Sequence, residues 1–275
     1  MVLWNAMTKE KLIFIGLGLF DEKDISLKGF KEIQKCEKVF AEFYTAKLTG
    51  TDIKKIEKTI GKTIEILTRD DTEKAEKILN IAKEKKVALL TCGDPMTATT
   101  HVDLRLRAEK LGIKTKIIHG SSIITAVPGL LGLQNYKFGR TTTLAFPEKN
   151  YFPTSPYNVI KENKKMGLHT LVLLDIQDDK KRYMTANEGI EFLLKMEEKH
   201  KENIIKPDGI ICVVARAGSP EPIAFAGLIK DLISKDFGPP LHSIVMPGKL
   251  HFMEIEALQI LAQLPAQQVR KLQKL

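Results

Sequence analysis

The chain has 275 residues, of which 43% are hydrophobic and 28% charged, and its formal net charge is +9. These values are ordinary for a globular protein, and the length allows one large domain or two of average size. A basic chain can bind nucleic acid, but here the lysines are spread along predicted helical faces and alternate with glutamates. That pattern favours solvated helix surfaces over a nucleic-acid site.

Targeting signals and cysteines point to a reducing compartment. The sequence contains no run of about 18 apolar residues that could span a membrane. Its first residues are too short and too weakly apolar for a secretion signal, and Met7 is a candidate start because ordered patterning begins only at Lys11. The three cysteines, Cys36, Cys92 and Cys212, lie far apart without a C-x-x-C motif. We therefore expect a cytoplasmic protein with reduced thiols, no membrane association and no metal site.

Apolar runs that predict strands alternate with amphipathic patterns that predict helices, which is typical of α/β proteins. In the first half, strands are predicted at residues 11–15, 38–42, 87–92 and 114–119. Helices are predicted at 26–35, from a capping signal at 70–73 onward, through Leu104, Leu106 and Leu111 to a stop at Gly112, and at 123–131.

A proline-rich segment interrupts this series. Residues 146–156 contain three prolines and are interpreted as a linker, with Ser155 as an N-cap and Pro156 as the first helical residue. A second α/β series follows, with strands at 168–174, 209–215 and 241–246, helices introduced by Thr185-x-x-Glu188 and at 253–264, and a helical or strand-like stretch at 222–233. The predicted domains are 1–148 and 149–275.

The most informative segment is Gly-Asp-Pro-Met-Thr-Ala-Thr-Thr-His at residues 93–101, which follows a predicted buried strand and precedes a helix. A strand that runs through such a turn into a helix places Asp94 and free backbone N–H groups at the carboxyl edge of a sheet, where open α/β sheets bind ligands. Asp94 has a second interpretation, which is to cap the helix that follows. The sequence predicts an enzyme that depends on a small molecule.

Several other predicted strands also end in small or polar residues. These segments lie in both halves of the chain, at 16–19, 118–123, 171–175 and 215–219. Together they indicate one ligand in a cleft between two sheets. The segment at 16–19 lacks a dinucleotide fingerprint, because Asp21 stands where the third glycine is needed. The sequence contains no P-loop, H-E-x-x-H or Gly-x-Ser-x-Gly motif.

The histidines show no spacing typical of metal ligands. Four of them lie near the ends of predicted elements, where a structural role is more common than a catalytic one: His101, His119, His169 and His242. His242 and His251 lie in the informative C-terminal segment.

Nine segments carry a resemblance to a known family. They are GLGLFDEKDIS (16–26), AEFYT (41–45), GDPMTATTH (93–101), IHGSSI (118–123), GLQNYKFG (132–139), GLHTLVLLDI (167–176), RYMT (182–185), ARAGS (215–219) and DFGPPLH…MPGKLHFMEIEAL (236–258). From about Lys11 to Pro265 the chain resembles the diphthine synthases, within the two-domain superfamily that includes the tetrapyrrole methylases.

This resemblance implies a tetrapyrrole methylase-like fold of two α/β domains with a cofactor cleft between them. It implies an S-adenosylmethionine-dependent methyltransferase of diphthamide biosynthesis, acting as a homodimer. The substrate would be translation elongation factor 2 that carries a 3-amino-3-carboxypropyl group on a histidine, and trimethylation of its amino group would give diphthine.

The family's cofactor contacts fall on eight positions of this sequence: Leu19, Asp94, Thr97, Ser122, Ile123, Leu173, Ala217 and His242. Leu173 and Ala217 would pack the adenine and offer backbone hydrogen bonds. Thr97 stands where an aliphatic residue is more usual, and Pro128 where a small residue is frequent.

No residue is identified as a catalytic base from the sequence, and no metal is expected. Two alternatives remain open: a tetrapyrrole (precorrin-type) methyltransferase of the same fold, and a non-catalytic basic nucleic-acid-binding protein. A tetrapyrrole methyltransferase does not account for the motifs GLQNYKFG and LHFMEIEAL. The nucleic-acid-binding alternative is supported by net charge alone.

Overall fold

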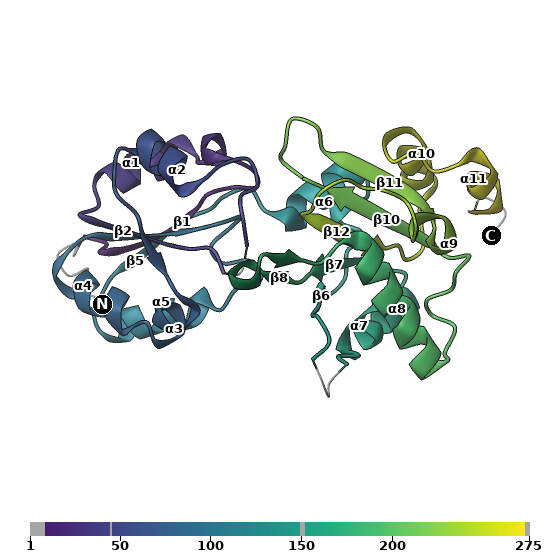
Figure 1. Ribbon diagram of the computed structural model, residues 1–275, viewed down its shortest axis with the longest axis horizontal. Coiled ribbons are helices and arrows are strands. Elements are labelled where there is room, and N and C mark those ends of the chain that lie inside the picture. The colour runs from purple at the N-terminus through teal and green to yellow at the C-terminus, as the bar shows by residue number, and fades with distance from the viewer. Residues whose placement is uncertain (1–8, 45, 149–151, 273–275) are drawn as a thin grey trace, which may run out of the picture. The chain divides into compact units, whose positions relative to one another are not determined.

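The computed structural model describes residues 9–44, 46–148 and 152–272, and it divides into two compact units, 1–122 and 123–275 (Figure 1). Met7 lies outside the described residues. The division lies earlier in the chain than the boundary at residue 148 that the proline-rich segment indicates. The reason is that residues 142–144 form a strand of the second sheet, so the chain has already entered the second unit before the prolines.

The first unit alternates strands and helices. Its elements are β1 (Leu12–Gly16), η1 (Glu22–Asp24), α1 (Leu27–Gln34), β2 (Lys38–Glu42), α2 (Ile53–Ile60), β3 (Glu65–Leu67), α3 (Arg69–Lys74), α4 (Glu76–Glu84), β4 (Val87–Thr91), α5 (His101–Lys110) and β5 (Thr115–Ile118). The strands form one parallel sheet in the order β3-β2-β4-β1-β5.

Helices cover both faces of this sheet, as the apolar strand sequences require. On one face Ile33 of α1 and Ile56 of α2 pack with Ile13. On the other, Ile78 of α4 and Leu104 of α5 pack with Leu12, Phe14 and their neighbours (Figure 1). All parallel strands therefore end at one edge of the sheet, and that edge carries the polar turns of the first unit.

The second unit contains the remaining elements. They are α6 (Ile123–Leu131), η2 (Asn135–Lys137), β6 (Thr142–Leu144), α7 (Ser155–Lys165), β7 (Thr170–Leu174), β8 (Ile176–Gln177), η3 (Asp178–Lys180), β9 (Arg182–Tyr183), α8 (Ala186–His200), β10 (Ile210–Ala215), β11 (Ile223–Leu228), α9 (Ile229–Leu232), β12 (His242–Met246), α10 (Phe252–Leu261) and α11 (Ala266–Leu272). The main sheet has the order β11-β10-β12-β7-β6, and β8 pairs with β9.

This second sheet is mixed. β12 is antiparallel to both β10 and β7, whereas β6 is parallel to β7. Alternation along β7 separates its two faces: Val172 packs in the core with α7 and α8, while Leu171 packs in the core with α6 and α10. Helices lie on both faces (Figure 1), so the fold class predicted from the sequence is confirmed.

Local predictions differ in their outcome. The capping box of Thr185 and Glu188 at the start of α8 is confirmed. The capping signal at 70–73 is wrong in detail: Thr68 caps α3 with Asp71 as its partner, and Ala75 adopts a left-handed conformation that separates α3 from α4. Ser155 is the first helical residue rather than the N-cap, which is Thr154.

The structure also settles or corrects other local predictions. The stretch 222–233 is both strand and helix, β11 followed by α9, and the helix predicted at 253–264 is α10, which ends at Leu261. In α5 Leu104 is buried, but Leu106 and Leu111 are exposed. Pro128 lies inside α6. All three cysteines are buried free thiols, as expected.

Candidate active site

Three glycines bring the ends of β1, β4 and β5 together. Gly16 closes β1, while Gly93 and Gly120 follow β4 and β5. A Cβ built on Gly120 would lie 2.4 Å from the carbonyl oxygen of Gly93 and 2.9 Å from the Cα of Gly16. Only glycine permits this approach, so the edge of the first sheet is closed by backbone rather than by side chains.

The turn after β1 is held by backbone hydrogen bonds and one carboxylate. Gly18 and Gly93 form an antiparallel bridge, in which the Gly93 N–H donates to the Gly18 carbonyl at 2.6 Å. Asp24 Oδ2 accepts from the N–H groups of Leu19 at 3.0 Å and Phe20 at 2.7 Å. Leu19, a predicted cofactor contact, is therefore held beside the Gly-Asp-Pro turn.

Asp94 lies at the centre of the Gly-Asp-Pro turn and is 8% exposed. Its Oδ1 accepts from the Met96 N–H at 2.9 Å and from the Thr97 hydroxyl at 3.4 Å. Its Oδ2 lies 2.7 Å from Nδ1 of His119. Asp94 thus organises its own turn and also orients a histidine from the next strand. The structure brings Asp94 and Thr97, two of the predicted cofactor contacts, together.

The segment after β5 supplies the other polar groups of this edge. His119 has an exposed side chain, and Ser122 is buried at 8% exposure. Ser122 is followed directly by Ile123, the half-buried first residue of α6. Within the first unit, the carboxyl edge therefore combines a carboxylate, an imidazole and a hydroxyl.

Three further predicted contacts share one edge of the second sheet. Strand pairing joins Leu173 with Ser243, next to His242, and joins His242 with Ala215, two residues before Ala217. Leu173 is half-buried and Ala217 is 9% exposed. Both belong to the apolar layer that also contains residues of α6 and α10. This edge offers apolar packing and backbone groups.

The ring of His242 is fully engaged within the second unit. Its Nδ1 accepts from the N–H of Ala186 at 3.0 Å, at the start of α8, and its Nε2 lies 3.1 Å from the Pro239 carbonyl. Burial lowers the pKa of His242, which outweighs the hydrogen bond to Pro239. The imidazole is therefore neutral, with its proton on Nε2, and its nitrogens act within the protein.

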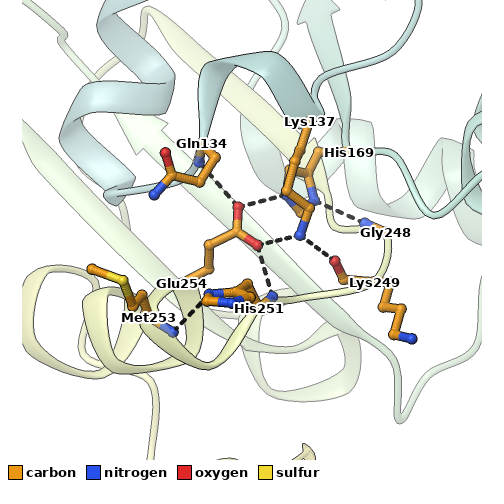
Figure 2. Close-up of polar contacts among 8 residues, drawn as sticks. All are labelled: Gln134, Lys137, His169, Gly248, Lys249, His251, Met253 and Glu254. Atoms are coloured by element: carbon orange, nitrogen blue, oxygen red, sulfur yellow. Dashed lines mark hydrogen bonds and ion pairs between the residues drawn. The ribbon is translucent and has the colours of Figure 1, made fainter.

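A buried polar network, absent from the sequence predictions, centres on Glu254 of α10 (Figure 2). Glu254 is 0% exposed, and its Oε1 accepts from the Gln134 N–H at 3.0 Å and from Nε2 of His169 at 3.0 Å. Its Oε2 accepts from the His251 N–H at 2.8 Å and pairs with Lys137. Lys137 also donates to the Lys249 carbonyl at 2.6 Å.

These contacts fix the charge state of the network. Burial by itself raises the pKa of Glu254, but hydrogen bonds from the His251 and Gln134 N–H groups, Lys137 and His169 lower it to about 2. Burial lowers the pKa of His169, whose Nδ1 accepts from the Gly248 N–H at 3.0 Å. The network therefore holds a charged Glu254, which pairs with Lys137, and a neutral His169.

The network ties together the segments 132–139, 167–170 and 246–254. These segments overlap three of the nine that carry the resemblance: those at 132–139, 167–176 and 236–258. The structural role predicted for His169 agrees with its two hydrogen bonds. The pairing of Lys137 with Glu254 carries no local sequence signal, because 117 positions separate them.

The described residues contain no group of three or more His, Cys, Asp or Glu side chains that could hold a metal ion. Within the same ranges, no helix is both long and apolar enough to cross a membrane.

The chemistry of the predicted contacts fits S-adenosylmethionine. Asp94, Thr97 and Ser122 offer oxygen acceptors and hydroxyl donors suited to the ammonium and carboxylate groups of an amino acid. Leu173 and Ala217 offer apolar surface and backbone groups suited to a purine. These assignments stay predictions.

Comparisons with known proteins identify the family of the chain. A model of the family Tetrapyrrole (Corrin/Porphyrin) Methylases matches residues 11–233. The chain belongs to this methylase family, with its parallel first sheet and mixed second sheet.

Within that family the chain is a member of the diphthine synthases. It is 57% identical over 255 residues to diphthine synthase of Methanocaldococcus jannaschii, covering 92% of this chain and 99% of the relative. The diphthine synthase of Methanococcus aeolicus is 55% identical over 253 residues, which cover 92% and 98% of the two chains. A crystal structure of diphthine synthase matches with a TM-score of 0.86 and 41% identity, over 94% of this chain and 98% of the other.

Proposed function

We propose that this chain is an S-adenosylmethionine-dependent methyltransferase of diphthamide biosynthesis. Its acceptor is the amino group of the 3-amino-3-carboxypropyl-histidine of translation elongation factor 2, and three methylations give diphthine. The observation that carries the proposal is the match to diphthine synthases at 55–57% identity over nearly the full length of both chains.

The eight predicted contacts serve the cofactor in this proposal. Asp94, Thr97 and Ser122 bind its amino acid end, and Leu173 and Ala217 pack its adenine. Leu19 and Ile123 contribute backbone and apolar surface. Since both ring nitrogens of His242 are engaged, His242 contributes through its backbone or ring edge. Bound S-adenosylmethionine supplies the methyl group as an electrophilic sulfonium.

The protein's part in such a displacement is to orient the acceptor and to keep its nitrogen unprotonated. A charged amine has no lone pair with which to attack, so its proton must leave before transfer. Elongation factor 2 is the protein partner in this proposal, and a homodimer in the cytoplasm is the expected assembly.

Transfer of labelled methyl groups tests the proposal. The purified chain is incubated with S-adenosylmethionine labelled in its methyl group and with elongation factor 2 that carries the aminocarboxypropyl histidine. Label is expected in the elongation factor 2 that carries the aminocarboxypropyl histidine. No label is expected in elongation factor 2 with an unmodified histidine. Label in a precorrin substrate, with none in elongation factor 2, would instead support the tetrapyrrole methyltransferase alternative.

A further inference from the structure

His119 is held by a hydrogen bond and is also open to solvent. His119 follows β5 at the carboxyl edge of the first sheet, and its Nδ1 lies 2.7 Å from Oδ2 of Asp94. The side chain of His119 is 73% exposed, whereas that of Asp94 is 9% exposed. A buried carboxylate thus holds one ring nitrogen of an imidazole that is otherwise exposed to solvent.

The contact assigns the proton on the ring. An ionised carboxylate only accepts hydrogen bonds, so Nδ1 of the neutral imidazole must carry the hydrogen. The lone pair then lies on Nε2. Among the described residues, none is hydrogen-bonded to this atom. A carboxylate that fixes the tautomer of a histidine base is a recurrent catalytic arrangement.

The buried histidines are different. His169 and His242 use both ring nitrogens in hydrogen bonds within the protein. His101 is 1% exposed and bonds to the carbonyl of Pro95 through Nδ1. None of these three offers a nitrogen to an incoming substrate.

Asp94 is itself held rigidly, which makes the orientation of His119 specific. Its Oδ1 accepts from the Met96 N–H, and the Thr97 N–H donates to its carbonyl at 3.2 Å. The carboxylate cannot turn without breaking the turn that contains it. His119 therefore presents Nε2 in one direction from the edge that carries Asp94 and Ser122.

We propose that His119 is the general base that removes the proton from the acceptor amine, and that Asp94 is its positioning residue. The inference rests on the proposed function, because it needs an amine that is protonated in water. In each round, the N–H bond of the ammonium breaks, its electron pair stays on nitrogen, and Nε2 of His119 takes the proton. The imidazolium then releases that proton to solvent.

This assignment accounts for repeated transfer. Each methyl group added leaves the nitrogen positively charged, so a proton must be removed before the next round. The ammonium, the methylammonium and the dimethylammonium forms each lose one proton, and the trimethylated product has none left on nitrogen. A base exposed to solvent can be regenerated between rounds.

His119→Asn is the sharpest variant. The Asn amide keeps a donor toward Asp94 but has no basic nitrogen. General base catalysis contributes roughly 100-fold or more, so we expect kcat to fall by about that factor. The dissociation constant for S-adenosylmethionine, measured by calorimetry, should be unchanged. Added imidazole should restore part of the rate. His200→Asn is the matched control, since His200 stacks on Tyr157 in the second unit.

The pH profile separates a base from a merely structural residue. In the wild type, kcat/KM should rise with a slope of one as pH increases and the base loses its proton. That limb should remain in H200N and disappear in H119N. A structural role would lower the rate of H119N without changing the shape of the profile.

A measurement without turnover tests the dyad itself. In 15N NMR spectra of the wild type, the neutral ring of His119 should carry its hydrogen on Nδ1. The Asp94→Asn variant should lose this preference for one tautomer. A wild-type spectrum with the hydrogen on Nε2 would overturn the inference.

The outcomes distinguish the two proposals. If the wild type transfers methyl groups and H119N matches it in rate and pH profile, the role of His119 is wrong and the proposed function stands. Loss of cofactor binding in H119N would make His119 a cofactor contact instead of a base. If the wild type transfers no methyl group to elongation factor 2, the proposed function fails and the role of His119 fails with it.

Discussion

At the level of single residues, the chain contains two kinds of polar cluster, one exposed to solvent and one buried. Asp94 and His119 form a pair in which the carboxylate is buried and the imidazole is open to solvent, as a catalytic role would require. Glu254 and His169 are buried in the second unit, where Glu254 pairs with the half-buried Lys137. The network around Glu254 fixes the conformation of the segments that it joins.

Glu254→Gln should destabilise the second unit. The substitution removes a buried charge and leaves Lys137 without its counter-ion, and breaking a buried pair costs about 3 kcal/mol. The free energy of unfolding in urea measures this loss. Glu256→Gln is the matched control, because Glu256 is exposed on the same helix and its loss should cost less than about 0.5 kcal/mol. Equal stabilities for the two variants would contradict the role given to the network.

The effect of Glu254 should depend on pH. Its pKa is about 2 in the folded chain, below the value of about 4.3 of an unfolded glutamate. A lowered folded pKa stabilises the protein above the unfolded pKa, and this contribution is lost as pH falls toward about 2. The difference in unfolding free energy between wild type and E254Q should therefore narrow from about pH 5 to pH 3. A difference that stays constant over this range would contradict the assignment.

At the scale of elements, the close approach of strand ends builds the candidate site. Gly16, Gly93 and Gly120 allow β1, β4 and β5 to end against one another, and the turns that follow carry Leu19, Asp94 and His119. A larger residue at Gly16 or Gly120 would push the strand ends apart and displace the polar groups.

Gly120→Ala tests this arrangement. Its Cβ would lie within 2.4 Å of the Gly93 carbonyl oxygen, so overpacking should cost about 1–3 kcal/mol of stability and weaken S-adenosylmethionine binding. The control is Gly129→Ala in α6, where a Cβ meets nothing within 4 Å and should stabilise the helix by roughly 0.5–1 kcal/mol. Thermal melts and calorimetry measure both effects. A G120A protein as stable as wild type would show that the strand ends have room to spare.

Elements were predictable where the signal is local. Thr185 and Glu188 stand three positions apart and mark the start of α8 without help from the rest of the chain. Thr68 was missed as a cap because Asp70, Asp71 and Glu73 present a competing signal directly after it. The sequence also gives no sign that Ala75 leaves the helical conformation.

Contacts between distant residues were not predictable. Asp94 and His119 lie 25 positions apart, and His169 and Glu254 lie 85 apart. The sequence placed Asp94 and His119 at strand ends but left the order of the strands unknown, and only that order brings the two side chains together. For the same reason the prolines at 147–156 do not mark the division between the compact units, since β6 pairs with a strand that comes later.

At the scale of the whole molecule, the chain combines a parallel sheet with a polar carboxyl edge and a mixed sheet with an apolar one. Asp94 and His119 lie at the edge of the first sheet, and Leu173, Ala217 and the neutral His242 lie at one edge of the second. Membership in the diphthine synthases places the chain among the methyltransferases of diphthamide biosynthesis.

The most direct test is to count the methyl groups on the product. Elongation factor 2 that carries the aminocarboxypropyl histidine is incubated with the chain and S-adenosylmethionine, and the histidine peptide is analysed by fragmentation mass spectrometry. The account predicts a gain of three methyl groups, all on the amino nitrogen. A peptide of unchanged mass, from a chain that binds S-adenosylmethionine, would contradict it, and a fourth methyl group on the carboxylate would contradict the proposed product.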